Sequence, residues 1–213
     1  MNKRKCSVAL IVATATSYLS STANAEDLRF TIFGAENRIN SQAVTDQLNG
    51  EVVDMMERSA DADEKHGFVV GGGISSAARS GLTYGLELAY RRNGFDVSGD
   101  NQFVGTNEER SGRTSVMSAM LNADYEHSGI GEGAVSPFMN LGAGYARLRT
   151  VLENDDFKTV DNAPAFQVGG GLRFHHSDRL STFLEYRYFR AIADGDNVDS
   201  DYVGHGVSIG LRF

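Results

Sequence analysis

Seven charged residues stand in stretches that otherwise carry small and apolar side chains, and they are the residues most able to do chemistry. Four are arginines and three are acids: Glu87, Arg91, Asp124, Arg173, Glu185, Arg187 and Arg212. An unpaired charge in a dry interior costs several kcal/mol, so charges that share an enclosed space must pair with one another. We expect a packed ion-pair network that fills the interior. A gated or ion-selective pore is the functional alternative.

The histidines do not assemble into a catalytic or metal-binding pattern. His175 and His176 are adjacent on an expected strand, so they point to opposite faces and cannot hold one ion together. His66, His127 and His205 fall at the ends of segments. A nucleophile would need a base within hydrogen-bond reach, and none is readable from the spacing. We therefore expect no enzyme activity, no cofactor and no metal.

These residues are positioned by segments in which apolar and small or polar residues alternate, the period of a β-strand. In one segment Leu82, Tyr84, Leu86, Leu88 and Tyr90 share a face. Most segments reach the about 9–11 residues that a tilted strand needs to cross a bilayer. Eight such segments are predicted, at 28–38, 67–77, 82–97, 114–126, 135–151, 164–175, 180–192 and 204–213.

The connections between these segments alternate in length. Residues 78–81 and 176–179 form short turns, whereas 127–134 is longer than a short turn requires. The other connections are long and polar, at 39–66, 98–113, 152–163 and 193–203. Short turns at one rim and long loops at the other are typical of a bacterial outer-membrane barrel. The sequence thus predicts an all-β, eight-stranded antiparallel up-and-down transmembrane barrel with four external loops.

A soluble barrel of the lipocalin kind would place its apolar face inside and a charged face in water. Here the polar faces are mainly glycine, alanine and serine, which suit a crowded interior, and Lys65 and Lys158 are the only lysines after residue 25. The fuller apolar faces suit lipid. An aromatic girdle is expected at the short-turn rim, formed by Tyr84, Tyr125, Phe174 and Phe213.

The first 25 residues have the pattern of a cleaved signal peptide. A basic start at 3–5 precedes an apolar stretch at 8–19 and the small residues Ala23 and Ala25. Cleavage would leave 26–213 as the barrel domain, without Cys6, the only cysteine. The leader holds three of the 20 basic residues and none of the 28 acidic ones, which leaves a formal net charge of −11. Such acidity argues against a nucleic-acid partner.

Three stretches resemble the small eight-stranded outer-membrane barrels, specifically the opacity-protein-like surface antigens. They are FMNLGAGYARLR (138–149), FQVGGGLRFHHSDRLSTFLEYRYFR (166–190) and HGVSIGLRF (205–213). GFVVGGGISSAARSGLTYGLELAYR (67–91) is also similar. The resemblance implies that the barrel-assembly machinery recognises the last strand through its alternating apolar residues, Val207, Ile209, Leu211 and Phe213. The long first loop departs from the family pattern.

Two loop segments carry further patterns. Apolar residues in 43–58 recur at three- and four-residue spacing, which predicts a short amphipathic helix; it could cap the barrel mouth, lie on the membrane or bind a partner. Asp194, Asp196, Asp199 and Asp201 lack the spacing of a calcium-binding EF-hand loop. We expect a solvated loop there, with weak divalent-ion bridging to lipopolysaccharide as an alternative.

Three functions are compatible with this sequence. The first is a structural or surface-interaction protein, adhesin- or antigen-like, with a plugged lumen; it would be a monomer in the outer membrane, contacting lipid, lipopolysaccharide and a surface or host ligand through its loops. The second is a narrow porin-like channel. The third is a lipid-modifying barrel enzyme.

Overall fold

The computed structural model describes residues 28–39, 60–64, 66–77, 81–101, 106–127, 134–152, 158–194 and 199–213. The predicted signal peptide at 1–25 and the predicted helix at 43–58 lie outside the described residues. Within those ranges no helix is long and apolar enough to cross a membrane.

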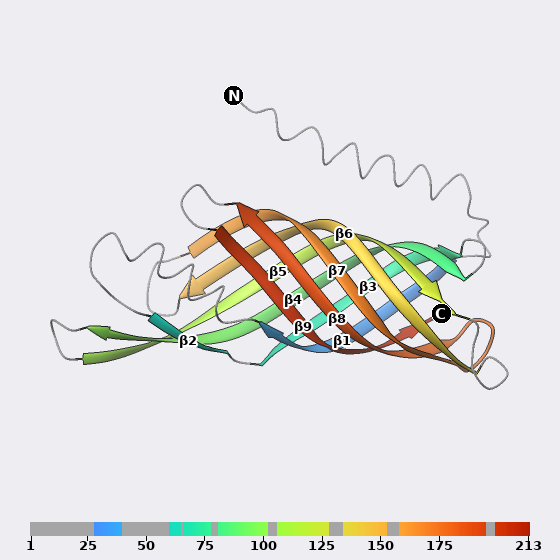
Figure 1. The fold of residues 1–213 in the computed structure, drawn as a ribbon, viewed down its shortest axis with the longest axis horizontal. Coiled ribbons are helices and arrows are strands. Elements are labelled where there is room, and N and C mark those ends of the chain that lie inside the picture. Colours follow the sequence, from blue (N-terminus) through green and yellow to red (C-terminus); the bar gives the residue numbers. More distant parts are fainter. Residues whose placement is uncertain are drawn as a thin grey trace, which may run out of the picture.

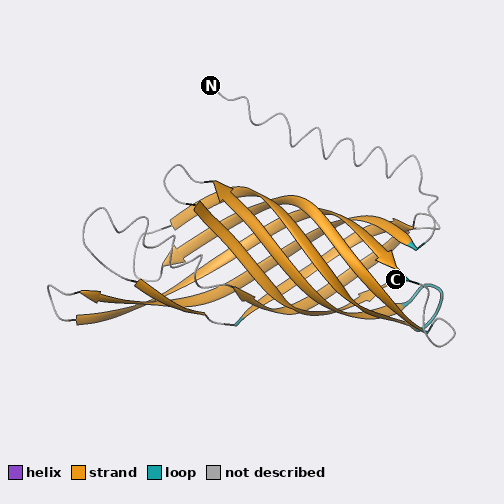
Figure 2. Cartoon of the chain, viewed as in Figure 1, coloured by secondary structure: helices purple, strands orange, loops and turns teal. Residues whose placement is uncertain are grey.

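All elements of the described chain are antiparallel strands (Figures 1 and 2). Their bounds are β1 Leu28–Ile39, β2 Ala60–Glu64, β3 Gly67–Ala77, β4 Leu82–Asn101, β5 Thr106–Glu126, β6 Val135–Leu152, β7 Lys158–His175, β8 Ser181–Asp194 and β9 Asp199–Arg212. The order of hydrogen-bonded neighbours is β2-β4-β3-β1-β9-β8-β7-β6-β5, and an additional β4–β5 pairing closes the sheet. Strand β2 pairs with 95–99 of β4, beyond the part that β3 occupies. Strands β2 and β3 therefore share one position in the wall, and the barrel has eight strands, as predicted.

The first and last barrel strands meet side by side. The amide of Phe30 donates to the carbonyl of Phe213 at 2.7 Å, and the amide of Phe213 donates back to Phe30 at 2.9 Å. The two rings stack with centroids 6.2 Å apart. The β1–β9 ladder continues to the pair Ile39↔Gly204. Closure of this kind satisfies the backbone groups that a free sheet edge would expose.

The strands at the loop end extend further than the predicted segments, so that paired residues occur within all four predicted loops; in 39–66 they include β2. Strands β4 and β5 remain paired up to Asn101↔Thr106, inside the predicted loop 98–113. Strand β7 begins at Lys158 and β9 at Asp199, inside the predicted loops 152–163 and 193–203. Beyond the apolar band the outward residues become polar, so the hydrophobic alternation fades while backbone pairing continues. Apolar periodicity therefore underestimates strand length there.

The two faces of the wall differ as the alternation predicted. Outward apolar side chains are exposed, with Leu88 at 67% and Ile209 at 65% of their full exposure. Inward neighbours are buried, including Ala89 and Ser208. Phe33, which breaks the alternation of the first segment, is an inward side chain that packs with Val69 and Phe183.

Candidate functional site in the barrel lumen

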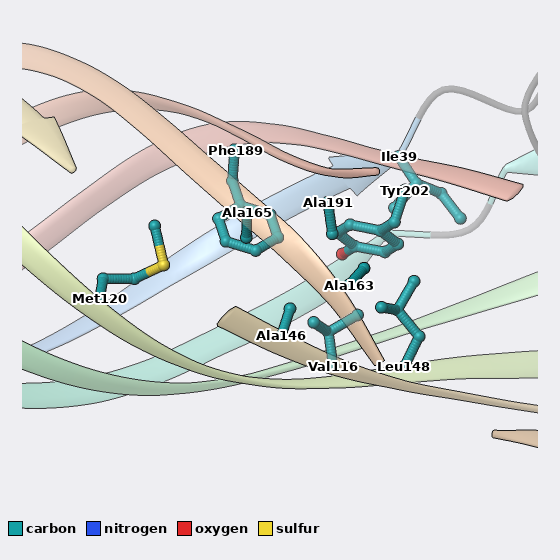
Figure 3. Packing of buried hydrophobic residues seen from close by; sticks show 10 residues of the cluster. All are labelled: Ile39, Val116, Met120, Ala146, Leu148, Ala163, Ala165, Phe189, Ala191 and Tyr202. Atoms are coloured by element: carbon teal, nitrogen blue, oxygen red, sulfur yellow. The ribbon is translucent and has the colours of Figure 1, made fainter. Parts of the chain in front are cut away.

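An apolar cluster fills the loop end of the lumen (Figure 3). Figure 3 labels its ten residues: Ile39, Val116, Met120, Ala146, Leu148, Ala163, Ala165, Phe189, Ala191 and Tyr202. The rings of Phe189 and Tyr202 meet edge to face, 6.0 Å apart. Small alanines from three strands leave space for these rings, so the cluster packs across the barrel.

A polar triangle adjoins this apolar cluster. The Nδ2 group of Asn37 donates to Asn93 Oδ1 at 2.8 Å and lies 2.9 Å from the hydroxyl of Tyr202. The Tyr202 hydroxyl donates to Asn93 Oδ1 at 2.9 Å, and Asn93 Nδ2 donates to the Asn37 carbonyl at 3.1 Å. Buried polar groups that bond one another in this way add little desolvation cost and fix the relative positions of three strands.

An ion-pair centre lies among the buried polar residues of the lumen. Arg187 Nη1 lies 2.8 Å from Glu87 Oε1, and Arg187 Nη2 lies 2.7 Å from Glu185 Oε2. Glu87 also accepts hydrogen bonds from Asn122 at 3.2 Å and from Gln167 at 3.3 Å. One guanidinium thus joins two carboxylates from β4 and β8, and neutral amides satisfy part of the remaining hydrogen-bonding capacity.

Three inward arginines each lie over a phenylalanine ring. The guanidinium carbon of Arg91 is 3.8 Å from the centroid of the Phe189 ring. The corresponding distances are 4.6 Å for Arg173 over Phe138 and 4.7 Å for Arg187 over the ring of Phe33. A guanidinium stacks well on an aromatic face, and the attraction strengthens when both groups are removed from water. The charged and apolar layers of the lumen are therefore in direct contact.

The structure does not bring all seven predicted charges into one network. Only Glu87, Glu185 and Arg187 form ion pairs with one another. Arg91 donates to Ser118 at 2.7 Å and to Gln167 at 3.5 Å. Asp124 accepts a hydrogen bond from Asn140 at 2.7 Å. Arg212 Nη2 lies 3.4 Å from the hydroxyls of both Ser75 and Thr83.

Arg173 pairs instead with Glu126, which the prediction omitted. Glu126 has the same parity as Asp124 on β5, so the alternation could have placed it inside. It lies past the girdle residue Tyr125, at the short-turn end. Burial opposes ionisation of this carboxyl, but Arg173 and His175 outweigh that effect and lower the pKa of Glu126.

The group around His175 does not have the geometry of a catalytic relay. His175 Nε2 lies 2.7 Å from Glu126 Oε1 and 3.2 Å from the hydroxyl of Ser136. A serine–histidine–acid relay needs the hydroxyl and the acid on opposite ring nitrogens, and here both contact the same one. His176 bonds Thr182 separately, at 3.0 Å. In the described part of the chain, no group of three or more potential metal ligands forms a site.

Open space is distributed unevenly along the lumen. Around the ion-pair centre, residues including Glu87, Glu185 and Arg187 line a cavity of about 50 Å³. A second, of about 20 Å³, is bounded by Arg91 and Phe189 among others. At the short-turn end a recess of about 680 Å³ opens outward. The two smaller spaces are at most the size of a few water molecules.

The outer surface carries an apolar band between two aromatic zones. At the short-turn end Phe30, Tyr84, Tyr125, Phe174 and Phe213 are exposed. Toward the loops, neighbouring strands pair Phe68 with Tyr90 and Phe166 with Tyr188. The predicted assembly residues Val207, Ile209, Leu211 and Phe213 all lie exposed on β9 or directly after it.

Arginines follow the apolar band at its loop-end boundary. On the outward faces of β1, β4, β5, β6 and β8 we define an arginine belt, formed by Arg38, Arg92, Arg113, Arg147 and Arg190. On β1 the belt also includes an acid, because Glu36 precedes Arg38 and pairs with it at 3.7 Å and with His66 at 2.5 Å. The predicted site residues do not include this belt, although strand parity and the end of the apolar band together specify it.

The solved structures that are similar to this fold include two bacterial outer-membrane barrels. Neisserial surface protein A gives a TM-score of 0.55 at 14% sequence identity, covering 89% of this chain and 98% of that one. The outer membrane protein OprG from Pseudomonas aeruginosa gives a TM-score of 0.50 at 12% identity, covering 87% and 95%. No family model matches the sequence, and no curated protein matches it. The likeness confirms the fold of a small eight-stranded outer-membrane barrel.

Proposed function

We propose that this chain is a bacterial outer-membrane protein with a closed lumen and a structural or surface-contact role. The exposed apolar band between two aromatic zones supports a position in the bilayer, with the short turns toward the periplasm. The names of the two similar proteins, one a surface protein and one an outer membrane protein, agree with that location. The loops would then carry adhesin- or antigen-like contacts with a surface or host ligand.

The observation that carries the closed-lumen proposal is the packing of side chains across the barrel. An eight-stranded barrel encloses little more space than its own side chains occupy. Among the described residues, the apolar cluster around Phe189 and the ion pairs of Arg187 occupy the middle and loop end of that space, next to cavities of about 50 Å³ and 20 Å³. A hydrated ion would have to displace both layers to cross.

Planar-bilayer recording tests this proposal. The refolded protein is expected to give no stable single-channel current. Arg187→Ala removes the cation shared by Glu87 and Glu185 but leaves the cluster around Phe189 in place, so it should also give no stable current. A stable current of uniform size from the unaltered protein would overturn the closed lumen and support a narrow channel.

The arginine belt supports anionic lipid as a partner. Arginine binds phosphate through paired hydrogen bonds, and lipopolysaccharide presents phosphate groups at the outer boundary of the membrane. Arg92 and Arg147 are exposed beyond the apolar band. We expect lipopolysaccharide in the vesicle to raise the unfolding temperature of the barrel.

The variant Arg92→Gln/Arg147→Gln should lose most of that increase, measured by the heat-dependent gel shift. Arg29→Gln/Arg179→Gln, at the opposite end of the barrel, removes the same number of positive charges and serves as the control. If lipopolysaccharide stabilises all three proteins equally, the belt does not bind it.

A further inference from the structure

The recess at the short-turn end is lined by cations from three strands. Arg29 of β1, Arg173 of β7 and Arg212 of β9 all line this space of about 680 Å³. Each has the parity of the inward face, so the barrel wall directs them into one opening. A recess of this size is within the range of small-molecule sites, about 300–1,000 Å³.

The charges of this recess are incompletely compensated. Arg173 is engaged by Glu126, which His175 also contacts. Among the residues that the structure describes, neither Arg29 nor Arg212 has an ion pair. The side chain of Arg212 reaches the hydroxyls of Ser75 and Thr83, with its Nη2 at 3.4 Å from each.

Like charges gather in this group, because Arg29, Arg173 and Arg212 line one recess. Glu126 lines the same recess, and Asp124 lines the adjoining cavity together with Arg173 and Arg212. Those two acids are already engaged, Asp124 by Asn140 and Glu126 by Arg173. The turn residues Asp178 and Arg179 add one charge of each sign. An anion in the recess would relieve the repulsion and supply acceptors for donors that are now weakly bonded.

We propose that this recess is a binding site for a phosphate-type oxyanion, held by Arg29 and Arg212 at the periplasmic mouth of the lumen. The guanidinium group presents several N–H donors in a planar fork that matches the oxygens of phosphate. Ser136 and Thr83, which also line the recess, offer hydroxyl donors. The phosphate belongs either to a small soluble molecule or to an anionic phospholipid headgroup at the rim. The site does not depend on whether the lumen conducts.

The test uses the refolded barrel in non-ionic detergent, in buffer free of phosphate, with inorganic phosphate as the probe. Calorimetric titration should show saturable binding that weakens as sodium chloride is added. Arg212→Gln and Arg29→Gln should each bind at least about tenfold more weakly, because each removes a charged hydrogen-bond donor. Lys158→Gln, an exposed position at the loop end outside both this recess and the arginine belt, should bind as the unaltered protein does.

A second arm distinguishes the sources of the phosphate. Side-chain NMR signals of the arginines are compared in nanodiscs of phosphatidylglycerol and of phosphatidylcholine. Binding of phosphate in detergent supports a soluble ligand. A response only to phosphatidylglycerol, lost in Arg212→Gln, supports a lipid headgroup.

Two results would contradict the proposed binding site. The first is neither phosphate binding in detergent nor an NMR response to phosphatidylglycerol. The second is an equal response in the unaltered protein, Arg212→Gln and Arg29→Gln. The heat-dependent gel shift verifies that each variant folds. If Arg212→Gln does not fold, the more accessible Arg29→Gln carries the comparison.

Discussion

The two ends of the lumen are built from different chemistry, although the same strands form both. At the loop end the inward residues are alanines and large apolar side chains, and they close the barrel around Phe189 and Tyr202. At the short-turn end the inward residues include Arg29, Arg173 and Arg212, around a recess of about 680 Å³. On the outer surface, by contrast, aromatic residues lie at both ends of the apolar band. Closure toward the loops and openness toward the short turns are therefore properties of the inward face alone.

The largest effect is expected from removing the central ring of the loop-end cluster. Phe189→Ala deletes the ring that contacts both Arg91 and Tyr202, and should lower the free energy of unfolding by about 3–5 kcal/mol. Urea unfolding in lipid vesicles measures the change. Arg29→Ala at the short-turn end should shift it by no more than about 0.5 kcal/mol. Equal losses at both ends would remove the contrast between them.

A smaller loss is expected where an inward glycine leaves space for a neighbour. A methyl group at Gly71 would lie 2.7 Å from Phe33 Cε1 and 2.9 Å from the Leu88 carbonyl oxygen. Gly71→Ala should therefore cost about 1–3 kcal/mol of unfolding free energy, because Phe33 must shift. The outward Gly34→Ala, whose added methyl has its nearest contact at 3.8 Å, is the matched control. Unfolding curves that coincide for the two variants would contradict tight packing of the inward face.

The smallest effect is a pH dependence confined to the short-turn end. The folded barrel lowers the pKa of Glu126 below its ordinary value of 4.5. Ionised Glu126 therefore stabilises the folded barrel at pH values above the ordinary pKa of 4.5. This stabilisation is lost as the pH falls through the lower pKa of the folded state. Unfolding free energies measured from pH 6 downward should fall less steeply for Glu126→Gln than for the unaltered protein. Parallel acid profiles would show that Arg173 and His175 do not hold this carboxylate ionised.

Strand parity predicted which residues face the lumen. It could not predict which of those residues contact one another. The alternation correctly placed Glu87 and Arg187 inside, because each lies between two apolar, outward neighbours. It could not pair them, since they are 100 residues apart and their contact depends on how β4 and β8 face each other across the closed barrel. The extended strands at the loop end were missed for another reason: 158–163 pairs through its backbone without an apolar face.

In the loop-end cluster, strand parity shows which residues face inward but does not show what role they have. Ala146, Ala163 and Ala191 are small residues that would suit a plug, a pore or a ligand cavity equally. Their role depends on the rings of Phe189 and Tyr202, which reach them from β8 and β9. The arginine belt is the opposite case. On β4, β5, β6 and β8 the first charged outward residue beyond the apolar band is an arginine, which the sequence gives once the strands are known.

Water access at the two ends of the lumen tests the central claim most directly. Single cysteines replace Ala191, which is fully buried at the loop end, and Arg29 at the short-turn end, in a Cys6→Ser background. The folded barrel is then treated with a charged, water-soluble thiol reagent, and labelling is followed by mass spectrometry. We predict rapid labelling of Arg29→Cys, and labelling of Ala191→Cys only after unfolding in urea. Equally fast labelling of both cysteines in the folded barrel would contradict a lumen closed toward the loops.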